Sequence, residues 1–224
     1  MIKKRIKNLR NLIKIYNIDA YIVPKNDEYF SEYAFPNRLK TISGFSGSAG
    51  FAIILKDINY LFVDGRYVTQ AKIESGKNFK ILEIPYHYPC DVLSKKKLNI
   101  GFDPNLFTEL TLKRYFNKYY NLVAINENLI DKIHLEKKSR IKSYFYHLNP
   151  KITGETSRSK IIRLKKILKK QKIDNLFISA PENVAWLLNL RGTDNPNSPI
   201  PNSKLIVSKK KIVLFSDFNK IKII

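Results

Sequence analysis

Short apolar runs alternate with segments of helical periodicity along the first half of the chain. Residues 2–16 carry apolar side chains at helical spacing behind a lysine-rich outer face, which predicts an amphipathic helix. Residues 18–23 follow as a run typical of a buried strand. Residues 51–55 and 60–63 are rich in branched and aromatic side chains and flank the mostly polar residues 56–59, which predicts a β-hairpin.

The alternation of strands and helices continues to residue 125 and argues for an α/β sandwich with a mixed sheet. Residues 27–39 are expected to be irregular, with a turn at Pro36 and Asn37. Thr108 is expected to cap a helix over residues 109–120. The side chains of that helix predicted to face inward are Leu110, Leu112, Tyr115, Phe116 and Tyr119. The other expected elements are a helix over 67–74 and strands over 79–84, 98–102 and 122–125.

The second half of the chain repeats the opening pattern after a polar, basic stretch. Residues 137–153 are typical of a linker, and Thr156 or Ser157 is expected to cap a helix over 159–171. The expected elements after it are a strand over 176–179, a helix over 182–188, and a hairpin of strands 205–207 and 212–215. Residues 5–23 and 161–179 share a helix-then-strand layout, which indicates a second copy of one fold. That copy is only half present, so we expect it to leave a sheet edge and an apolar face uncovered.

A loop rich in glycine and serine precedes the first hairpin. A phosphate-binding loop needs a Gly-Lys-Ser/Thr ending that opens a helix, but Gly50 is followed by Phe51 and a strand. A nucleophile elbow needs Gly-x-Ser-x-Gly, but Ser46 stands two residues before Ser48. The residues themselves favour a close-packed turn that feeds the hairpin.

Several segments resemble the amino-terminal region of long-form Xaa-Pro aminopeptidases, in the creatinase and prolidase superfamily. They are residues 20–24, 31–33, 43–50, 64–67, 128–131 and 185–192, in the order and spacing of that family. The sequence departs from the pattern at Tyr29, where a His is common, and at residues 201–204, where a Phe and then a Tyr are expected after the serine.

The resemblance implies a creatinase/prolidase amino-terminal fold, a mixed sheet flanked by helices, followed by a truncated second copy. The implied boundaries are domain I over residues 1–134, a linker over 135–157 and an incomplete domain II over 158–224. It also implies a structural loop built from Gly44, Gly47, Gly50, Asp64 and Gly65.

Three residues are implied to support a substrate groove: Glu32, Arg66 and Arg191. A carboxylate and a guanidinium can form a bidentate bond, so Glu32 is expected to pair with Arg66 and to fix a wall of the groove. The residues alone favour the other reading, in which Glu32 is an exposed acid or one paired with a lysine.

The chain carries few groups for bond-breaking chemistry. A dinuclear metallopeptidase needs about five carboxylate and imidazole ligands, and none of the histidines His87, His134 and His147 has a partner at metal-binding spacing. We therefore predict no catalytic residue and no metal ligand here. In the resembling family those residues, with two divalent ions such as Mn, lie in a carboxy-terminal catalytic domain expected beyond Ile224.

Composition adds a strong basic charge. Lys and Arg number 41 against 19 Asp and Glu among 224 residues, a formal net charge of +22. That charge would suit a polyanion, but the lysines are dispersed, as on a solvated surface. A basic nucleic-acid-binding α/β protein is the lesser alternative, with the aromatics of residues 115–120 and 144–147 stacking on bases.

The remaining features point to a cytoplasmic protein. No apolar run approaches the ~20 residues of a membrane span, and the amino terminus lacks the pattern of a signal peptide. The single cysteine, Cys90, excludes an internal disulfide. A strand follows the first helix at once, which favours packing of that helix over membrane binding.

These observations predict the non-catalytic amino-terminal portion of a Xaa-Pro aminopeptidase-like metallopeptidase, inactive alone. Its expected contributions are a groove wall and contacts between subunits, and its expected partners are a catalytic domain, a separately encoded catalytic half, or a second copy in a homodimer. The alternative from a different class is a stand-alone protein-binding module.

Overall fold

The structure is a computed structural model that describes residues 1–31, 35–93, 97–116, 119–134, 144–195 and 197–217. The chain folds as two units, Met1–Lys137 (unit 1) and Lys138–Ile224 (unit 2). Among the described residues, no helix is long and apolar enough to cross a membrane.

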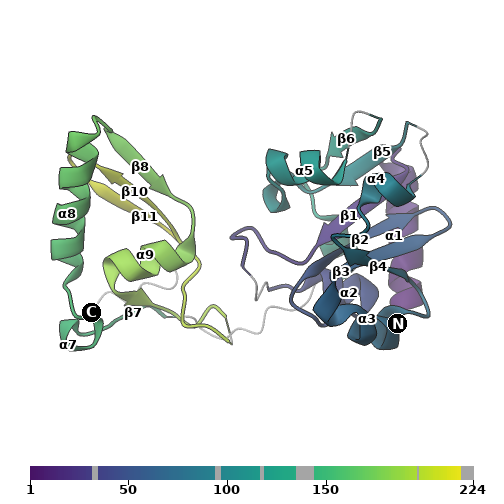
Figure 1. Ribbon diagram of the computed structural model, residues 1–224, viewed down its shortest axis with the longest axis horizontal. Helices are drawn as coiled ribbons and strands as arrows, with labels where there is room; N and C mark the ends of the chain where they lie inside the picture. The colour runs from purple at the N-terminus through teal and green to yellow at the C-terminus, as the bar shows by residue number, and fades with distance from the viewer. Residues whose placement is uncertain (32–34, 94–96, 117–118, 135–143, 196, 218–224) are drawn as a thin grey trace. The chain divides into compact units, whose positions relative to one another are not determined.

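Unit 1 is built on a six-stranded mixed sheet of order β4-β3-β2-β1-β5-β6 (Figure 1). Its strands are β1 (Ala20–Pro24), β2 (Gly50–Leu55), β3 (Asn59–Asp64), β4 (Lys80–Ile84), β5 (Asn99–Phe102) and β6 (Asn121–Ala124). Strand β1 is antiparallel to β2 and parallel to β5, and all five of its residues are buried. The expected mixed sheet is confirmed, and so is the hairpin, in which β2 and β3 pair antiparallel with Ile53 opposite Tyr60.

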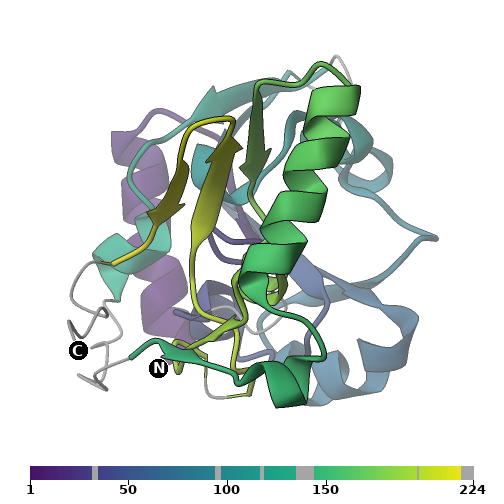
Figure 2. The ribbon, with the colours of Figure 1, turned by 90° about the vertical axis from the view of Figure 1, so that its left-hand side faces the viewer.

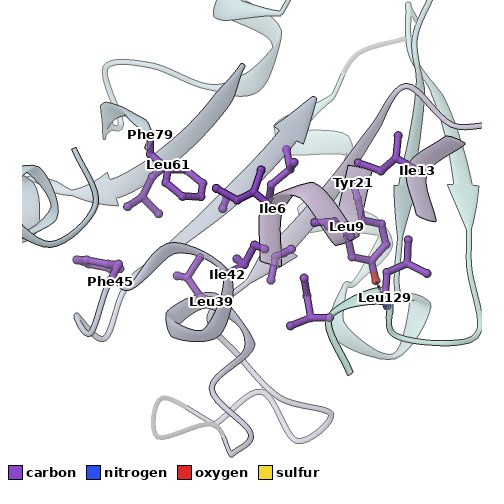
Figure 3. Close-up of a cluster of buried hydrophobic side chains, with 14 of the residues drawn as sticks. Ile6, Leu9, Ile13, Tyr21, Leu39, Ile42, Phe45, Leu61, Phe79 and Leu129 are labelled. Atoms are coloured by element: carbon purple, nitrogen blue, oxygen red, sulfur yellow. Dashed lines mark hydrogen bonds between the residues drawn. The ribbon is translucent and has the colours of Figure 1, made fainter. Parts of the chain in front are cut away.

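Helices flank both faces of this sheet because each strand alternates its side chains between two apolar clusters. One cluster joins Ile6, Leu9 and Ile13 of α1 to alternate strand residues such as Tyr21 and Leu61 (Figure 3). The other joins Ile22, Ile53 and Phe62 to the segment around α5. The helices of unit 1 are α1 (Ile2–Ile15), α2 (Arg38–Ser43), α3 (Val68–Ser75), α4 (Pro89–Val92), α5 (Glu109–Tyr115) and α6 (Leu129–Ile133), with 3-10 turns η1 (Gly65–Tyr67) and η2 (Pro104–Leu106).

Two sequence expectations for unit 1 are wrong in detail. Thr108 caps α5 as predicted, by accepting a hydrogen bond from the Thr111 amide, but the helix ends at Tyr115 because Phe116 is extended. Leu110 and Tyr119, predicted to face inward, are 80% and 61% exposed. The helix turns the positions around Leu112 toward the sheet, and Tyr119 lies beyond its end.

The stretch predicted to be irregular contains the start of a helix. Asn37, read as a turn residue, is the N-cap of α2, and its side-chain oxygen accepts a hydrogen bond from the Lys40 amide at 3.0 Å. Asn and Asp favour both turns and helix N-caps, so local sequence does not separate the two readings.

Unit 2 repeats the first part of unit 1. Its helix α8, strand β8, helix α9 and strands β10 and β11 follow one another as α1, β1, α2, β2 and β3 do, and the strand order β11-β10-β8 mirrors β3-β2-β1 (Figure 2). This layout fits a second, truncated copy of the fold. The bounds are α7 (Pro150–Thr153), α8 (Ser157–Lys170), α9 (Pro181–Leu188), β7 (Tyr146–His147), β8 (Asn175–Ile178), β9 (Leu190–Arg191), β10 (Lys204–Ser208) and β11 (Ile212–Phe215).

The stretch expected to be a linker, residues 135–157, contains β7 and α7. Strand β7 pairs antiparallel with β9, with Tyr146 opposite Arg191. The domain boundaries implied by the sequence stay a prediction.

Candidate functional site

A hollow of about 540 Å³ lies in unit 1 where several segments meet at one end of the sheet. Its lining residues come from four segments: the residues that follow β1, the start of β2, the turn after β3, and the α5 region. Two cations, Lys25 and Arg66, share this lining with hydroxyl, amide and aromatic groups. The other lining residues are Pro24, Asn26, Phe30, Ser31, Ser48, Ala49, Gly50, Phe51, Phe107, Thr111 and Tyr115.

A tight turn after β1 forms one side of the hollow. The Asp27 carboxylate is 3% exposed, and its Oδ1 accepts hydrogen bonds from the amides of Tyr29 at 2.9 Å and Ser31 at 3.0 Å. Burial raises the pKa of Asp27 above its usual range, although these two bonds act in the opposite direction. Asn26 ties the turn to the α5 side by donating to the carbonyl of Leu106 at 2.9 Å.

The glycine-rich loop contributes Ser48, Ala49 and Gly50 to the lining of the hollow. Gly44 ends α2 in the left-handed conformation, with φ of 86°, which a residue without a Cβ adopts at little cost. Gly50 begins β2 so close to β3 that a Cβ there would lie 2.6 Å from the Phe62 carbonyl oxygen. Between them, Ser48 shares a hydrogen bond of 2.8 Å with the Tyr67 hydroxyl. The loop therefore depends on backbone contacts that a larger residue would break.

Arg66 stands at the mouth of the hollow and is held by its neighbours in the sequence. Its Nε donates to Asp64 Oδ1 at 2.8 Å, and its guanidinium carbon lies 5.4 Å from the centre of the Tyr67 ring. Hydrogen bonds from Arg66 lower the pKa of Asp64, so this carboxylate stays charged. Both side chains are exposed, so the pair orients the guanidinium more than it stabilises the fold.

Stacked aromatic rings form an apolar wall. Phe51 lies between Phe62, at 4.7 Å between ring centres, and Tyr115, at 4.3 Å. Burial raises the pKa of Tyr115, so its hydroxyl stays protonated. A cationic mouth, several hydrogen-bond donors and an aromatic wall suit binding of a peptide or a carboxylate.

The three residues expected to support a groove belong to different parts of the chain. Arg66 lines the hollow of unit 1, whereas Glu32 lies outside the described residues, and so does its expected pair with Arg66. Arg191 belongs to β9 of unit 2, where its Nη1 donates to the carbonyls of Leu190 at 2.8 Å and Ala185 at 3.2 Å. The groove roles of all three stay a prediction.

Sequence reasoning missed most of the hollow's lining. The sequence does not mark Lys25, Asn26 and Phe107 as site residues, because they come from segments that only the folded sheet brings together. One signal was available: residues 25–27 are polar and directly follow a buried strand, and binding sites gather at such strand ends.

The part of the chain that the structure describes holds no group of three or more His, Cys, Asp or Glu side chains that could bind a metal ion. His134, for example, lies 3.0 Å from Arg5 Nη2, a cation that opposes metal binding. The residues present therefore do not fit a dinuclear metal centre.

Both units match models of one kind of domain. Residues 5–133 match a family described as the creatinase/prolidase N-terminal domain, and residues 136–223 match a second model with the same description. The two matches support the expected fold and its second, partial copy.

Relatives and a solved structure extend this match along nearly the whole chain. A Laccaria bicolor protein named "Probable Xaa-Pro aminopeptidase P" is 36% identical over 96% of this chain, which spans 35% of that relative. "Xaa-Pro aminopeptidase 1" of Dictyostelium discoideum is 33% identical over 98% of this chain, which spans 38% of it.

The structure of the X-prolyl aminopeptidase from Caenorhabditis elegans, described as a cytosolic enzyme with a di-nuclear active site, superposes with a TM-score of 0.88 at 28% identity. The superposition covers 99% of this chain and 40% of the C. elegans chain. The chain thus spans little more than a third of the proteins it resembles. With a family model matching residues 5–133, more than half of its length, this chain belongs to the creatinase/prolidase N-terminal domain family.

Proposed function

We propose that this chain is the non-catalytic amino-terminal portion of a Xaa-Pro aminopeptidase-like metallopeptidase. The whole enzyme would remove the amino-terminal residue that precedes proline. The observation that supports this proposal is the alignment with Xaa-Pro aminopeptidases over 96% of this chain but only 35% of the first relative. The described residues of the hollow include donors and aromatics but no carboxylate, imidazole or thiol, so their contribution is binding.

In this proposal the hollow of unit 1 forms part of the substrate-groove wall. Arg66 is oriented by Asp64 and Tyr67 and would donate a charge-assisted hydrogen bond to a carbonyl or carboxylate of the peptide. Glu32 and Arg191 would support the same groove, and the chain would also contribute contacts between subunits.

In this proposal the catalytic metal ions lie in the catalytic domain and not in this chain. Two divalent ions, Mn in our proposal, would be held by the catalytic domain, because the described residues here do not fit such a centre. The partner is that catalytic domain, in the same polypeptide or separately made, and a homodimer is compatible with the proposal. We place the protein in the cytoplasm, as the C. elegans enzyme is cytosolic.

A chimera tests the proposal directly. This chain replaces the matched amino-terminal part of the Laccaria bicolor relative, and release of the first residue from an X-Pro-Y peptide is measured with added Mn²⁺. We expect turnover by the chimera and none by this chain alone. A folded chimera without turnover, or turnover by this chain alone, would contradict the proposal.

Substitution of Arg66 tests the role of the hollow. Arg66→Ala in the chimera is expected to lower kcat/KM about tenfold, the loss that corresponds to one charge-assisted hydrogen bond. Arg114→Ala is the matched control, because Arg114 is also exposed and also lies over a tyrosine ring, 5.5 Å from that of Tyr88. Equal effects of the two substitutions on kcat/KM would contradict the proposed role of Arg66 in the groove.

A further inference from the structure

Phe30 has a left-handed backbone conformation that aromatic residues rarely adopt. Its φ is 58°, and among the described residues the other non-glycine positions with a positive φ are Asn17, Lys172 and Asn189. Those three are polar, and each lies at the end of a helix or directly after it, where this conformation is common. Phe30 stands instead in the turn after β1, so a bulky ring is held where Gly or Asn would cost less free energy.

Hydrogen bonds to Asp27 hold the turn in this shape. Phe30 donates its amide to the Asp27 carbonyl at 3.0 Å. The amides on either side of it, those of Tyr29 and Ser31, donate to the Asp27 carboxylate. The surroundings therefore impose the left-handed conformation on Phe30, and strain of this kind gathers at binding and catalytic sites.

The Phe30 ring contributes little to the core of unit 1. Phe30 is 52% exposed, whereas the other phenylalanines that line the hollow, Phe51 and Phe107, are 1% and 8% exposed. It belongs to neither of the two apolar clusters that pack on the sheet of unit 1. Folding therefore gives no reason for a phenylalanine at this strained position.

The hollow combines this exposed ring with an aromatic wall and with cations. Phe51 and Tyr115 are stacked, with 4.3 Å between their ring centres, and both line the hollow together with Phe30. Lys25 and Arg66 line it as well. Its volume of about 540 Å³ lies within the range of roughly 300–1,000 Å³ that is usual for small-molecule sites. The hollow thus has room for a bulky apolar side chain and for a polar group that faces a cation.

We propose that Phe30 determines specificity in the hollow, which takes a bulky apolar side chain of a peptide between the Phe30 ring and the wall of Phe51 and Tyr115. The inference deepens the proposed function and rests on it, because the peptide is then the substrate and Arg66 donates to the carbonyl or carboxylate beside the bound side chain. A bulky side chain buries the exposed ring, and an aromatic one also gains from ring–ring geometry. A small side chain leaves the Phe30 ring in water and binds more weakly.

Peptide binding to the full chain tests this assignment without a catalytic domain. The probe is Ala-Pro-Phe, which carries a ring and a carboxylate on one residue, and Ala-Pro-Ala is the comparison. Amide chemical shifts of the isotope-labelled chain are followed by NMR during each titration. We expect shifts at Phe30, Ser48 and Arg66, and an affinity about tenfold higher for Ala-Pro-Phe than for Ala-Pro-Ala, because burial of an aromatic side chain favours binding.

The variant Phe30→Asn separates binding from folding. Asn tolerates the left-handed conformation better than Phe, so this variant should unfold at the same urea concentration as the parent chain or at a higher one. Its affinity for Ala-Pro-Phe should nevertheless fall about tenfold, because the ring that contacts the peptide is lost. A purely structural role of Phe30 would not give this combination.

Two further variants control the measurement. Phe30→Leu should recover part of the affinity that Phe30→Asn loses, because it returns an apolar side chain to the hollow. Phe35→Ala is the matched control, since Phe35 is a 44% exposed phenylalanine of unit 1 that does not line the hollow. Its substitution should leave the affinity for Ala-Pro-Phe unchanged.

Three results would overturn the inference. The first is no binding of Ala-Pro-Phe, and the second is an equal affinity for Ala-Pro-Phe and Ala-Pro-Ala. The third is an unchanged affinity for Ala-Pro-Phe in Phe30→Asn, and a lower urea midpoint of that variant would then assign Phe30 to folding.

The chimera distinguishes a failure of this inference from a failure of the proposed function. An active chimera, beside a chain that binds the two tripeptides equally, overturns only the role of Phe30. An inactive chimera, beside binding of Ala-Pro-Phe that depends on Phe30, overturns only the proposed function and leaves a peptide site in the hollow.

Discussion

The guanidinium of Arg38 forms two parallel hydrogen bonds with the carboxylate of Asp131, with Nε 2.9 Å from Oδ1 and Nη2 2.7 Å from Oδ2. Arg38 begins α2 and Asp131 belongs to α6, so this bidentate pair joins two helices far apart in the sequence. Glu28 adds a further contact at 2.7 Å. Burial alone would lower the pKa of Arg38, but its hydrogen bonds to Asp131 and Glu28 outweigh burial and raise it, so the guanidinium stays charged.

Removing Asp131 should destabilise unit 1. Arg38 is 6% exposed, so Asp131→Ala leaves a buried cation with only part of its partners, and we expect the free energy of unfolding to fall by about 2–3 kcal/mol. The control is Glu28→Ala, because Glu28 is 41% exposed and water can replace its contact, so its loss should stay below about 1 kcal/mol. Urea denaturation measures both, and equal losses would contradict the assignment of Asp131 as the main partner.

Lys160 should stabilise the fold of unit 2. Its buried ammonium donates to Asn189 Oδ1 at 2.7 Å and to the Trp186 carbonyl at 2.8 Å, which ties α8 to the end of α9. Lys160→Met keeps the chain length but leaves both acceptors without this donor, at a cost of about 2 kcal/mol.

Trp186 reports this change directly, because it is the single tryptophan and the Lys160 ammonium lies 4.2 Å from its ring centre. Its emission should show unit 2 unfolding at lower urea in Lys160→Met. The exposed Lys166 on the same helix provides the control substitution, Lys166→Met. A parent-like transition in Lys160→Met would show that these bonds add no net stability.

Gly50→Ala should weaken the β2–β3 hairpin. The added Cβ would lie 2.6 Å from the Phe62 carbonyl oxygen, a backbone atom that moves only if the strands separate, so we expect a loss of about 2–4 kcal/mol. Gly154→Ala is the comparison, because Gly154 has φ of 73° with nothing within 4 Å, and its cost should be only about 1 kcal/mol of backbone strain. Thermal unfolding followed by circular dichroism compares the stability losses of the two variants. A larger loss in Gly154→Ala than in Gly50→Ala would contradict the close approach of Gly50 to Phe62.

Asp27 should make stability fall as pH rises through part of the acid range. Burial raises its pKa in the folded chain, so between its ordinary pKa and the raised value the folded chain binds more protons than the unfolded chain. The free energy of unfolding therefore decreases with pH across that window.

Asp27→Asn should remove this contribution, since an amide oxygen still accepts from the Tyr29 and Ser31 amides but carries no charge. The variant should gain stability over the parent above the window, as measured by urea midpoints at several pH values. Asp64→Asn should act with the opposite sign, because hydrogen bonds from Arg66 lower the pKa of Asp64. An unchanged pH profile in Asp27→Asn would contradict the raised pKa.

The sequence predicted what depends on local spacing. The hairpin followed from two apolar runs around polar residues 56–59, and the cap of α8 followed from Thr156, whose hydroxyl accepts from the Ser159 amide at 3.1 Å. It missed α2 and α6, since Asn37 and Asn128 read equally well as turn residues until the helix after them is known.

The candidate site was predicted only in part, because it depends on strand order. The family resemblance named Arg66 and composition marked the glycine-rich loop, but Lys25 and Tyr115 come near them only through the parallel pairing of β1 with β5. Periodicity indicates that a strand exists but not which strand lies beside it.

The position of β1 inside its sheet also has a consequence for synthesis of the chain. Ala20 of β1 lies opposite Leu55 of β2 on one side and beside Ile100 of β5 on the other. During synthesis β1 can therefore pair with β2 early, but its other side stays unpaired until β5 has left the ribosome. During that interval an apolar ribbon stays available to wrong partners, and translation of the middle segment is therefore the period when a ribosome-associated chaperone would matter most.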